Sequence, residues 1–222
     1  MKKLFLLLIS AVFMQIHAEN PVYDFARGKW DKNDWFIIKS ARWEHVGSWV
    51  QNDDHIQNHV PENLNEAAIK KSRESYAAML LKEKIKIKKE CIIQSEMSFD
   101  HRMAPLIVIA PVIGVSAKGV PEFREHWEVV LYDLGINVWH HQYKDGKPSH
   151  VRAAFLYSPF QKKVRYTLQL TVTNTRKGRM LTVECDGKKF GCFMPGLPCD
   201  FHTGIIGCEG INRFYNFKVS VK

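Results

Sequence analysis

The chain has 222 residues, 45% of them hydrophobic, and carries 32 Lys and Arg against 23 Asp and Glu, a formal net charge of +9 at pH 7. This length suits one domain that buries its own core, and no repeat or low-complexity tract divides it. The basic residues are scattered and form no nucleic-acid-binding motif, which excludes nucleic acid as the expected partner and leaves an acidic polysaccharide or a membrane surface compatible with the charge.

Residues 1–18 predict a secretory signal peptide. Two lysines precede an apolar run that is too short to span a bilayer, and small or polar residues lead to Ala18. An N-terminal membrane anchor is the alternative. No later segment approaches the roughly 18 apolar residues of a spanning helix. We therefore expect a secreted or periplasmic protein that leaves the membrane after cleavage, with a single domain over residues 19–222.

Five cysteines follow the predicted leader, and export would permit disulfides among them. One must stay unpaired unless it bridges to another chain. Their spacing is not that of a zinc site, so we expect structural cysteines, either free or paired. They are Cys91, Cys185, Cys192, Cys199 and Cys208.

The first predicted elements are a hairpin and a helix. Trp43–Gln51 predicts a strand, residues 52–54 a turn, and His55–His59 a short return strand. Pro61–Ser72 predicts the one helix, because Pro opens it, acidic residues come early and lysines come late. At about three turns, this helix is expected to be an insertion between strands.

From Tyr76 onward the pattern is that of strands and turns. Tyr76–Lys88 alternates apolar residues with lysine, which predicts one buried and one wet face, and the apolar Pro105–Val115 predicts a strand buried on both sides. The Asp-Gly turn at 186–187 predicts a hairpin. Further predicted strands are Cys91–Phe99, Glu125–Tyr132, Ile136–Gln142, Val151–Ser158, Val164–Asn174, Leu181–Cys185, Phe190–Met194, His202–Gly207 and Phe214–Val221. The predicted fold class is all-β, a two-sheet antiparallel β-sandwich with one short helical insertion.

Polar residues gather on one face of the stretch Glu125–Gln142. Successive side chains of a strand point to opposite faces, so His126, Glu128 and Tyr132 should share one side, while Trp127, Val129 and Leu131 share the other. After the break at 133–135, the same parity groups Asn137, Trp139 and His141. We expect two neighbouring strands that bury one face and present a polar, open face.

Several segments resemble the concanavalin A-like lectin and glucanase jelly roll, and more narrowly the secreted bacterial family of 3-keto-disaccharide hydrolases. They are Trp43–Gln51, Trp127–Asp133, Val183–Phe190, Gly204–Gly207 and Phe214–Val219. The resemblance implies a jelly roll with a glycan at its concave sheet. The chain departs from laminarinase-type relatives, because it lacks their Glu-x-Asp-x-(x)-Glu run, and it has no clean copy of the strands of alginate-lyase-type relatives.

Two glutamates are candidates for the acid and the base or nucleophile of a glycosidase, Glu96 and Glu128, with His126 as a further general base. Ordinary solvated carboxylates on a strand face are the alternative. The predicted substrate-binding residues are Gln94, Tyr132, Asn137, Trp139, His141 and Arg152, placed on the same open face by parity.

The expected function is that of a secreted carbohydrate-active protein, most simply a glycoside-hydrolase-like enzyme acting on an oligo- or polysaccharide. One alternative is a polysaccharide lyase on an acidic glycan, in which a histidine or Tyr132 takes a proton and Arg152 neutralises the carboxylate. Another is a non-catalytic binding module. We expect no cofactor and no metal, because His140 and His141 are neighbours on a strand that point to opposite sides, and no Asp/Asn cluster predicts a calcium loop.

Overall fold

The computed structural model describes residues 20–71, 73–102, 105–194 and 196–222. The predicted signal peptide, residues 1–18, lies outside these ranges. No helix in the described ranges is long and apolar enough to cross a membrane.

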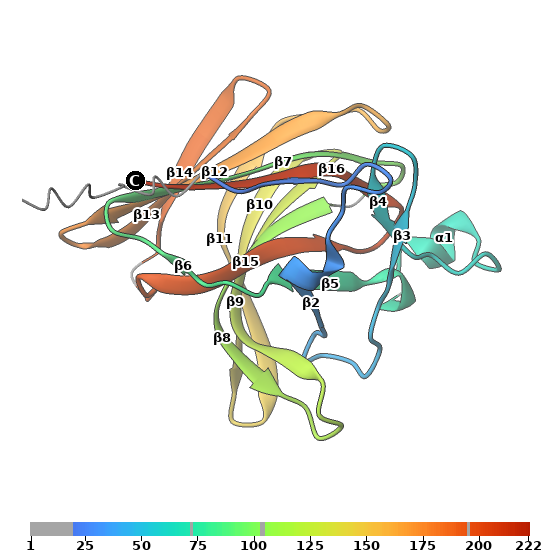
Figure 1. Ribbon diagram of the computed structural model, residues 1–222, viewed down its shortest axis with the longest axis horizontal. Helices are drawn as coiled ribbons and strands as arrows, with labels where there is room; N and C mark the ends of the chain where they lie inside the picture. The colour runs from blue at the N-terminus through green and yellow to red at the C-terminus, as the bar shows by residue number, and fades with distance from the viewer. Residues whose placement is uncertain (1–19, 72, 103–104, 195) are drawn as a thin grey trace, which may run out of the picture.

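The first of two antiparallel sheets contains β14 (Lys188–Met194), β13 (Gly178–Cys185), β12 (Tyr166–Thr175), β7 (Glu90–Phe99), β16 (Asn212–Val221), β4 (Ile56–Asn58) and β3 (Trp49–Gln51) in that order, with β1 (Val22–Asp24) beside β16. The second contains β11 (Lys147–Tyr157), β10 (Gly135–Lys144), β9 (Pro121–Tyr132), β8 (Pro105–Val115), β15 (Asp200–Gly207), β5 (Ala77–Leu81) and β2 (Trp35–Ile38), with β6 (Ile85–Lys86) beside β15. Figure 1 shows β7 and β16 in one layer and β15, β5 and β2 in the other.

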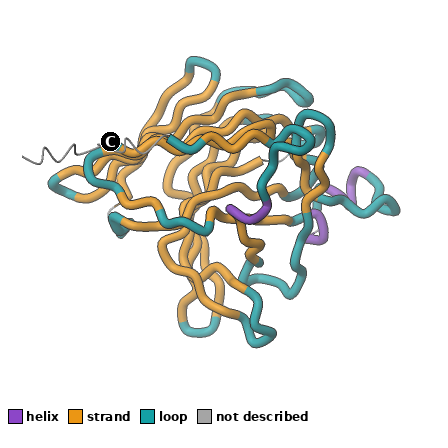
Figure 2. Tube along the Cα trace, in the orientation of Figure 1, coloured by secondary structure: helices purple, strands orange, loops and turns teal. Residues whose placement is uncertain are grey.

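Among the described residues, helix is confined to short segments in the connections between strands, as Figure 2 shows. They are α1 (Glu66–Ile69) and two 3-10 turns, η1 (Lys32–Asp34) and η2 (Arg73–Ser75). The predicted all-β sandwich with one short helical insertion is therefore confirmed.

The main core lies between the two sheets. Alternate residues of each strand point inward, as strand geometry requires; on β9 these are Trp127, Val129 and Leu131, and on β7 they include Ile93 and Met97. All five are buried. Burial of this apolar area is the dominant force that holds the two sheets together.

A second apolar cluster covers the outer face of the second sheet. Leu106 and Val108 of β8 lie in it with Val130 of β9, and Trp43 and Tyr76 pack over them. The prediction that Pro105–Val115 is buried on both sides is confirmed for residues 105–110, after which the strand emerges. The same cover explains why the wet face predicted for Tyr76–Lys88 is wrong in β5, all of whose residues are buried.

Two predicted elements are shorter than expected. The helix predicted at Pro61–Ser72 is a single turn, Glu66–Ile69, which begins where the Asn65 side chain accepts a hydrogen bond from the Ala68 amide at 2.9 Å; Ser72 lies outside the described residues. The first predicted hairpin forms, but its first strand covers only Trp49–Gln51 of the predicted Trp43–Gln51, paired with β4. The sequence pattern predicted both elements to be longer than they are, because neither segment packs a continuous face against a sheet.

All five cysteines are free, and the disulfides that export would permit do not form. Burial raises the pKa of the Cys91 and Cys185 thiols to about 12 and that of Cys192 to about 11. These three thiols stay protonated at neutral pH and serve as small apolar groups in the core.

We predict that Gly204→Ala lowers the free energy of unfolding by about 3 kcal/mol or more, because an added Cβ would lie 2.0 Å from the Met79 carbonyl oxygen of the neighbouring strand β5. Gly196 has open space around the same position, so Gly196→Ala is the matched control and should change stability by less than about 0.5 kcal/mol. Urea unfolding of both variants measures the difference. Equal stability of the two variants would contradict the close approach of β15 and β5.

Candidate functional site

The register of three strands gathers the polar residues into two rows. His126 of β9 lies opposite His141 of β10, and Glu128 lies opposite Trp139. Across the other edge of β10, β11 sets His150 opposite His141 and Arg152 opposite Trp139. One row is therefore three histidines and the next is Glu128, Trp139 and Arg152, all on the outer face of the sheet. The predicted common face is confirmed for these strands.

The histidine row is a stack of rings. Phe123 lies against His126 with ring centroids 4.2 Å apart, and the His126 and His141 rings are 4.7 Å apart and tilted by only 11°. His150 continues the stack at 5.5 Å from His141 and also meets the edge of Trp139 at 5.7 Å. The stack fixes the ring planes, so both inner imidazoles present the same edge.

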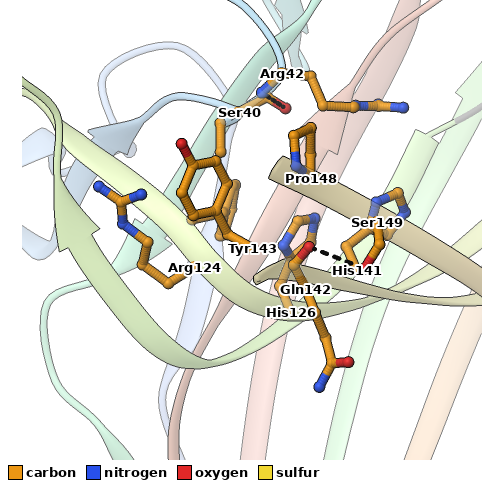
Figure 3. A pocket seen from close by; sticks show the side chains of 11 residues that line it. Ser40, Arg42, Arg124, His126, His141, Gln142, Tyr143, Pro148 and Ser149 are labelled. Atoms are coloured by element: carbon orange, nitrogen blue, oxygen red, sulfur yellow. Dashed lines mark hydrogen bonds between the residues drawn. The ribbon is translucent and has the colours of Figure 1, made fainter. Parts of the chain in front are cut away.

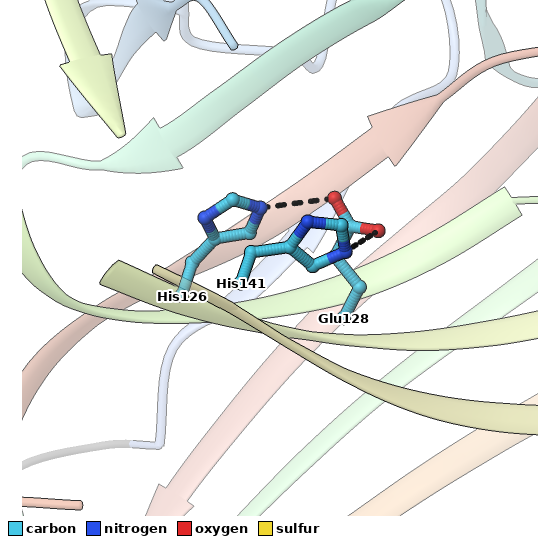
Figure 4. A group of neighbouring side chains, drawn as sticks. All are labelled: His126, Glu128 and His141. Atoms are coloured by element: carbon cyan, nitrogen blue, oxygen red, sulfur yellow. Dashed lines mark hydrogen bonds and ion pairs between the residues drawn. The ribbon is translucent and has the colours of Figure 1, made fainter. Parts of the chain in front are cut away.

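That edge faces Glu128. His126 Nε2 lies 3.0 Å from Glu128 Oε1, and His141 Nε2 lies 3.2 Å from Glu128 Oε2. Figure 4 shows the two imidazoles pointing at the two oxygens of the one carboxylate. The three residues are 7%, 9% and 8% exposed in the order His126, His141 and Glu128. We call them the His126–Glu128–His141 triad.

The Glu128 side chain of the triad is an ionised carboxylate. Burial acts to raise the pKa of Glu128, but the attraction of His141 and the hydrogen bond from His126 outweigh it, so that this pKa lies well below its usual value. Burial is the main reason that the pKa of His126 is lowered. The buried carboxylate is thus ionised at neutral pH while the His126 imidazole is neutral.

A hollow of about 160 Å³ opens beside the triad. We call it the Trp139 hollow; it is lined by Arg42, Leu106, Glu128, Val130, Trp139, His141, His150, Cys208 and Glu209. On the other side of His141, a pocket of about 20 Å³, enough for a water molecule, is bounded by Arg42, His126 and Tyr143 among others. Figure 3 shows Arg42 on one side of this small pocket and the two imidazoles on the other. The triad is therefore reached from two sides.

Glu209 is a site residue that the sequence did not single out. It follows β15 with a φ of 52°, a left-handed conformation that is uncommon outside glycine and marks candidate functional sites. Burial raises the pKa of Glu209, and Glu128 adds to the rise while Arg42 opposes it. Arg42 and Cys208 were missed as well. All three reach the hollow from loops distant in sequence, which no local pattern reveals.

The predicted pairing of Glu96 with Glu128 is wrong. Glu96 and Gln94 lie on β7, in the sheet that does not contain β9. Their side chains lie on its outer face, where Glu96 accepts a hydrogen bond from the Asn216 amide at 3.2 Å and lies 3.8 Å from Arg165. The core between the sheets separates the two glutamates. Parity was right within β7, but parity does not say which sheet a strand joins.

Tyr132 and Asn137 share the outer face of β9 and β10 with the triad but do not line the hollow. They lie farther along the strands, where Tyr132 pairs with Gly135 and packs against Phe155 at 6.3 Å. Asn137 is 5% exposed, and its Oδ1 atom has no hydrogen-bond partner among the described residues. Arg152 does adjoin the hollow, with its guanidinium 5.9 Å from the Trp139 ring.

Structures of known proteins share this fold. A carbohydrate-binding module, CBM66 from Bacillus subtilis, superposes with a TM-score of 0.55 at 9% sequence identity, covering 84% of this chain and 95% of that one. The VIP36 exoplasmic/lumenal domain in its Ca²⁺/Man3GlcNAc-bound form gives 0.55 at 11% identity, covering 89% and 87%. A GlcNAcα1-4Gal releasing endo-β-galactosidase from Clostridium perfringens gives 0.57 at 9% identity, covering 90% of this chain and 62% of that one. The fold is a jelly-roll β-sandwich.

No protein-family model and no curated protein sequence matches the chain. The narrower resemblance to the 3-keto-disaccharide hydrolases therefore stays a prediction. At these identities the structural likeness establishes the fold, and function depends on the residues of the site itself.

We predict that Glu128→Gln lowers the free energy of unfolding by about 1–3 kcal/mol in the presence of a chelator, because the amide has one acceptor oxygen where the carboxylate has two for the buried imidazoles. Glu96→Gln, on the outer face of the other sheet, should cost less than about 0.5 kcal/mol. Chemical denaturation at neutral pH compares them. A Glu96→Gln effect as large as that of Glu128→Gln would contradict the assigned geometry.

Proposed function

We propose that this chain binds a saccharide in the Trp139 hollow. The observation that carries the proposal is the position of Trp139, half-buried between a histidine and an arginine at the edge of the second apolar cluster. A tryptophan in such a place presents apolar ring area to a ligand beside hydrogen-bonding groups, the combination that a sugar ring needs.

The other lining residues suit the same ligand. Leu106 and Val130 add apolar surface, while Arg42, His150 and Glu209 offer donors and acceptors for hydroxyl groups. At about 160 Å³, the hollow is smaller than the roughly 300–1,000 Å³ pockets that enclose drug-sized ligands. It therefore suits one sugar ring, with the rest of an oligosaccharide lying over the exposed strand β11.

The structural neighbours support a saccharide as the ligand class. Their names describe a carbohydrate-binding module, a mannose-oligosaccharide-bound domain and an enzyme that releases a disaccharide from a glycan. Export by the predicted signal peptide would bring this chain to glycans outside the cytoplasm, in the periplasm or beyond the cell.

Glycoside hydrolysis is a second candidate, favoured by two carboxylates that line one hollow. Glu209 and Glu128 do so with pKa values displaced in opposite directions, the usual relation between the acid and its partner in a glycosidase. Glu209 would be the general acid and Glu128 the base or nucleophile. In the lyase alternative the base would be a histidine, because His141 and His150 line the hollow and Tyr132 does not.

We predict that Trp139→Ala weakens saccharide binding at least about tenfold, which corresponds to about 1.4 kcal/mol. A panel of neutral and uronate-containing oligosaccharides is first screened for a ligand by titration calorimetry with the wild-type protein. The matched control is Trp49→Ala, because Trp49 lines a separate aromatic hollow with Trp30 and Trp35 and should leave affinity unchanged. Equal losses in both variants, or no binding to any member of the panel, would contradict the proposal.

The same panel separates binding from hydrolysis. Release of reducing ends that is abolished by Glu209→Gln while binding persists would establish the second candidate. Binding without release assigns the chain to the binding modules. Formation of unsaturated uronate products would show that the reaction is a lyase elimination and not hydrolysis by the carboxylate pair.

A further inference from the structure

Three side chains of the buried triad converge as metal ligands do. One nitrogen each from His126 and His141 and one oxygen from Glu128 all lie within 4.8 Å of one another. We infer that the His126–Glu128–His141 triad binds a divalent first-row transition-metal ion. The inference goes beyond saccharide binding and does not depend on it.

The two separations that join Glu128 to the histidines fit such an ion. Metal–ligand bonds of about 2.0–2.2 Å place neighbouring ligand atoms roughly 2.9–3.5 Å apart in octahedral or tetrahedral sites. The Nε2–Oε distances from Glu128 are 3.0 Å to His126 and 3.2 Å to His141. An ion could enter between the three atoms without a change of strand register.

The ligand types select the class of ion. Two imidazoles and one carboxylate suit zinc, iron, cobalt or manganese, whereas calcium and magnesium prefer oxygen ligands alone. Three protein ligands leave at least one coordination position for a water or a ligand group. Since Glu128 and His141 line the Trp139 hollow, that position can face it.

The surroundings hold the ligands in place. Two of the three come from directly opposed positions of β9 and β10, and the third is two residues along β9 on the same face. Phe123 and His150 close the ends of the ring stack. A buried Nε2 atom of His141 lies at ion-pair distance from Glu128 without an aligned hydrogen bond, so it is free to take a stronger partner.

The same strands contain a matched control on their opposite face. His140 Nε2 lies 2.8 Å from Glu125 Oε1, with its ring stacked on Trp127 at 4.0 Å. This pair has the same chemistry, but no third metal-ligating side chain among the described residues lies close enough to complete a group of three. It should bind no ion tightly.

Glu128 can fill only one chemical role at a time. As a metal ligand it cannot also serve as the free base or nucleophile of the hydrolytic candidate. Metal binding by the triad and hydrolysis by the Glu209–Glu128 pair are therefore alternative uses of one carboxylate, and the experiment that follows also bears on that choice.

The test is a titration of untagged, chelator-treated protein with Co²⁺ and Zn²⁺, read by cobalt absorption and by calorimetry. We expect one ion per chain. Glu128→Gln and His141→Gln should each weaken binding by at least tenfold, while His140→Gln stays within about threefold of the wild type. A parallel Ca²⁺ titration should show no binding at this site.

A second control removes the nearby thiol. Cys208 lines the hollow, so Cys208→Ser must keep its affinity if the triad, and not the thiol, binds the ion. Thermal unfolding verifies that each variant is folded; where His141→Gln is not, His126→Asn takes its place. The proposal is overturned if the wild type binds neither ion, or if binding survives both Glu128→Gln and a folded histidine variant. No saccharide is present, so the result is independent of the proposed function.

Discussion

The register between β9 and β10 is the constraint on which the rest of the site depends. It sets His126 opposite His141 and Glu128 opposite Trp139, while the intervening residues enter the core. Because strand side chains alternate with a period of two, a slip of β9 by one residue would turn His126 and Glu128 into the core and bring Trp127 and Val129 outward. Burial of the inward-facing apolar residues thus selects the register that brings the outward-facing residues of the site together.

The polar set is buried because a separate segment closes over the outer face of the sheet. Lys39, itself buried, forms an ion pair with Glu122 of β9 at 2.7 Å and donates to the Trp43 carbonyl at 3.0 Å. Backbone hydrogen bonds link Lys39 to Pro121 and Phe123 on either side of that glutamate. This anchoring holds Trp43 over the second apolar cluster and brings Arg42 to the hollow. The cost of burying Glu128 is offset by the two imidazoles that face it.

Much of the fold and part of the site could be predicted from the sequence. Period-two alternation identified the strands and grouped His126, Glu128, Trp139 and His141, because neighbours in one hairpin keep their parity. The membership of β7 in the other sheet could not be predicted, since it depends on long-range pairing, and so Glu96 was misplaced. Arg42 and Glu209 come from loops whose positions follow from tertiary packing. The convergence of His126 and His141 on Glu128 could not be predicted from the adjacent pair His140–His141, because the converging histidines are opposed across two strands.

The His126–Glu128–His141 triad is a preorganised metal site, and two of its members, Glu128 and His141, line the Trp139 hollow. The most direct measurement is an anomalous difference map from crystals soaked in Zn²⁺, recorded on both sides of the zinc absorption edge. We predict one dominant peak about 2.0–2.2 Å from an Nε2 atom of each histidine and an oxygen of Glu128. A dominant peak at Cys208 or at His140 and Glu125, or no peak at the triad at full soak, would contradict metal binding by the triad.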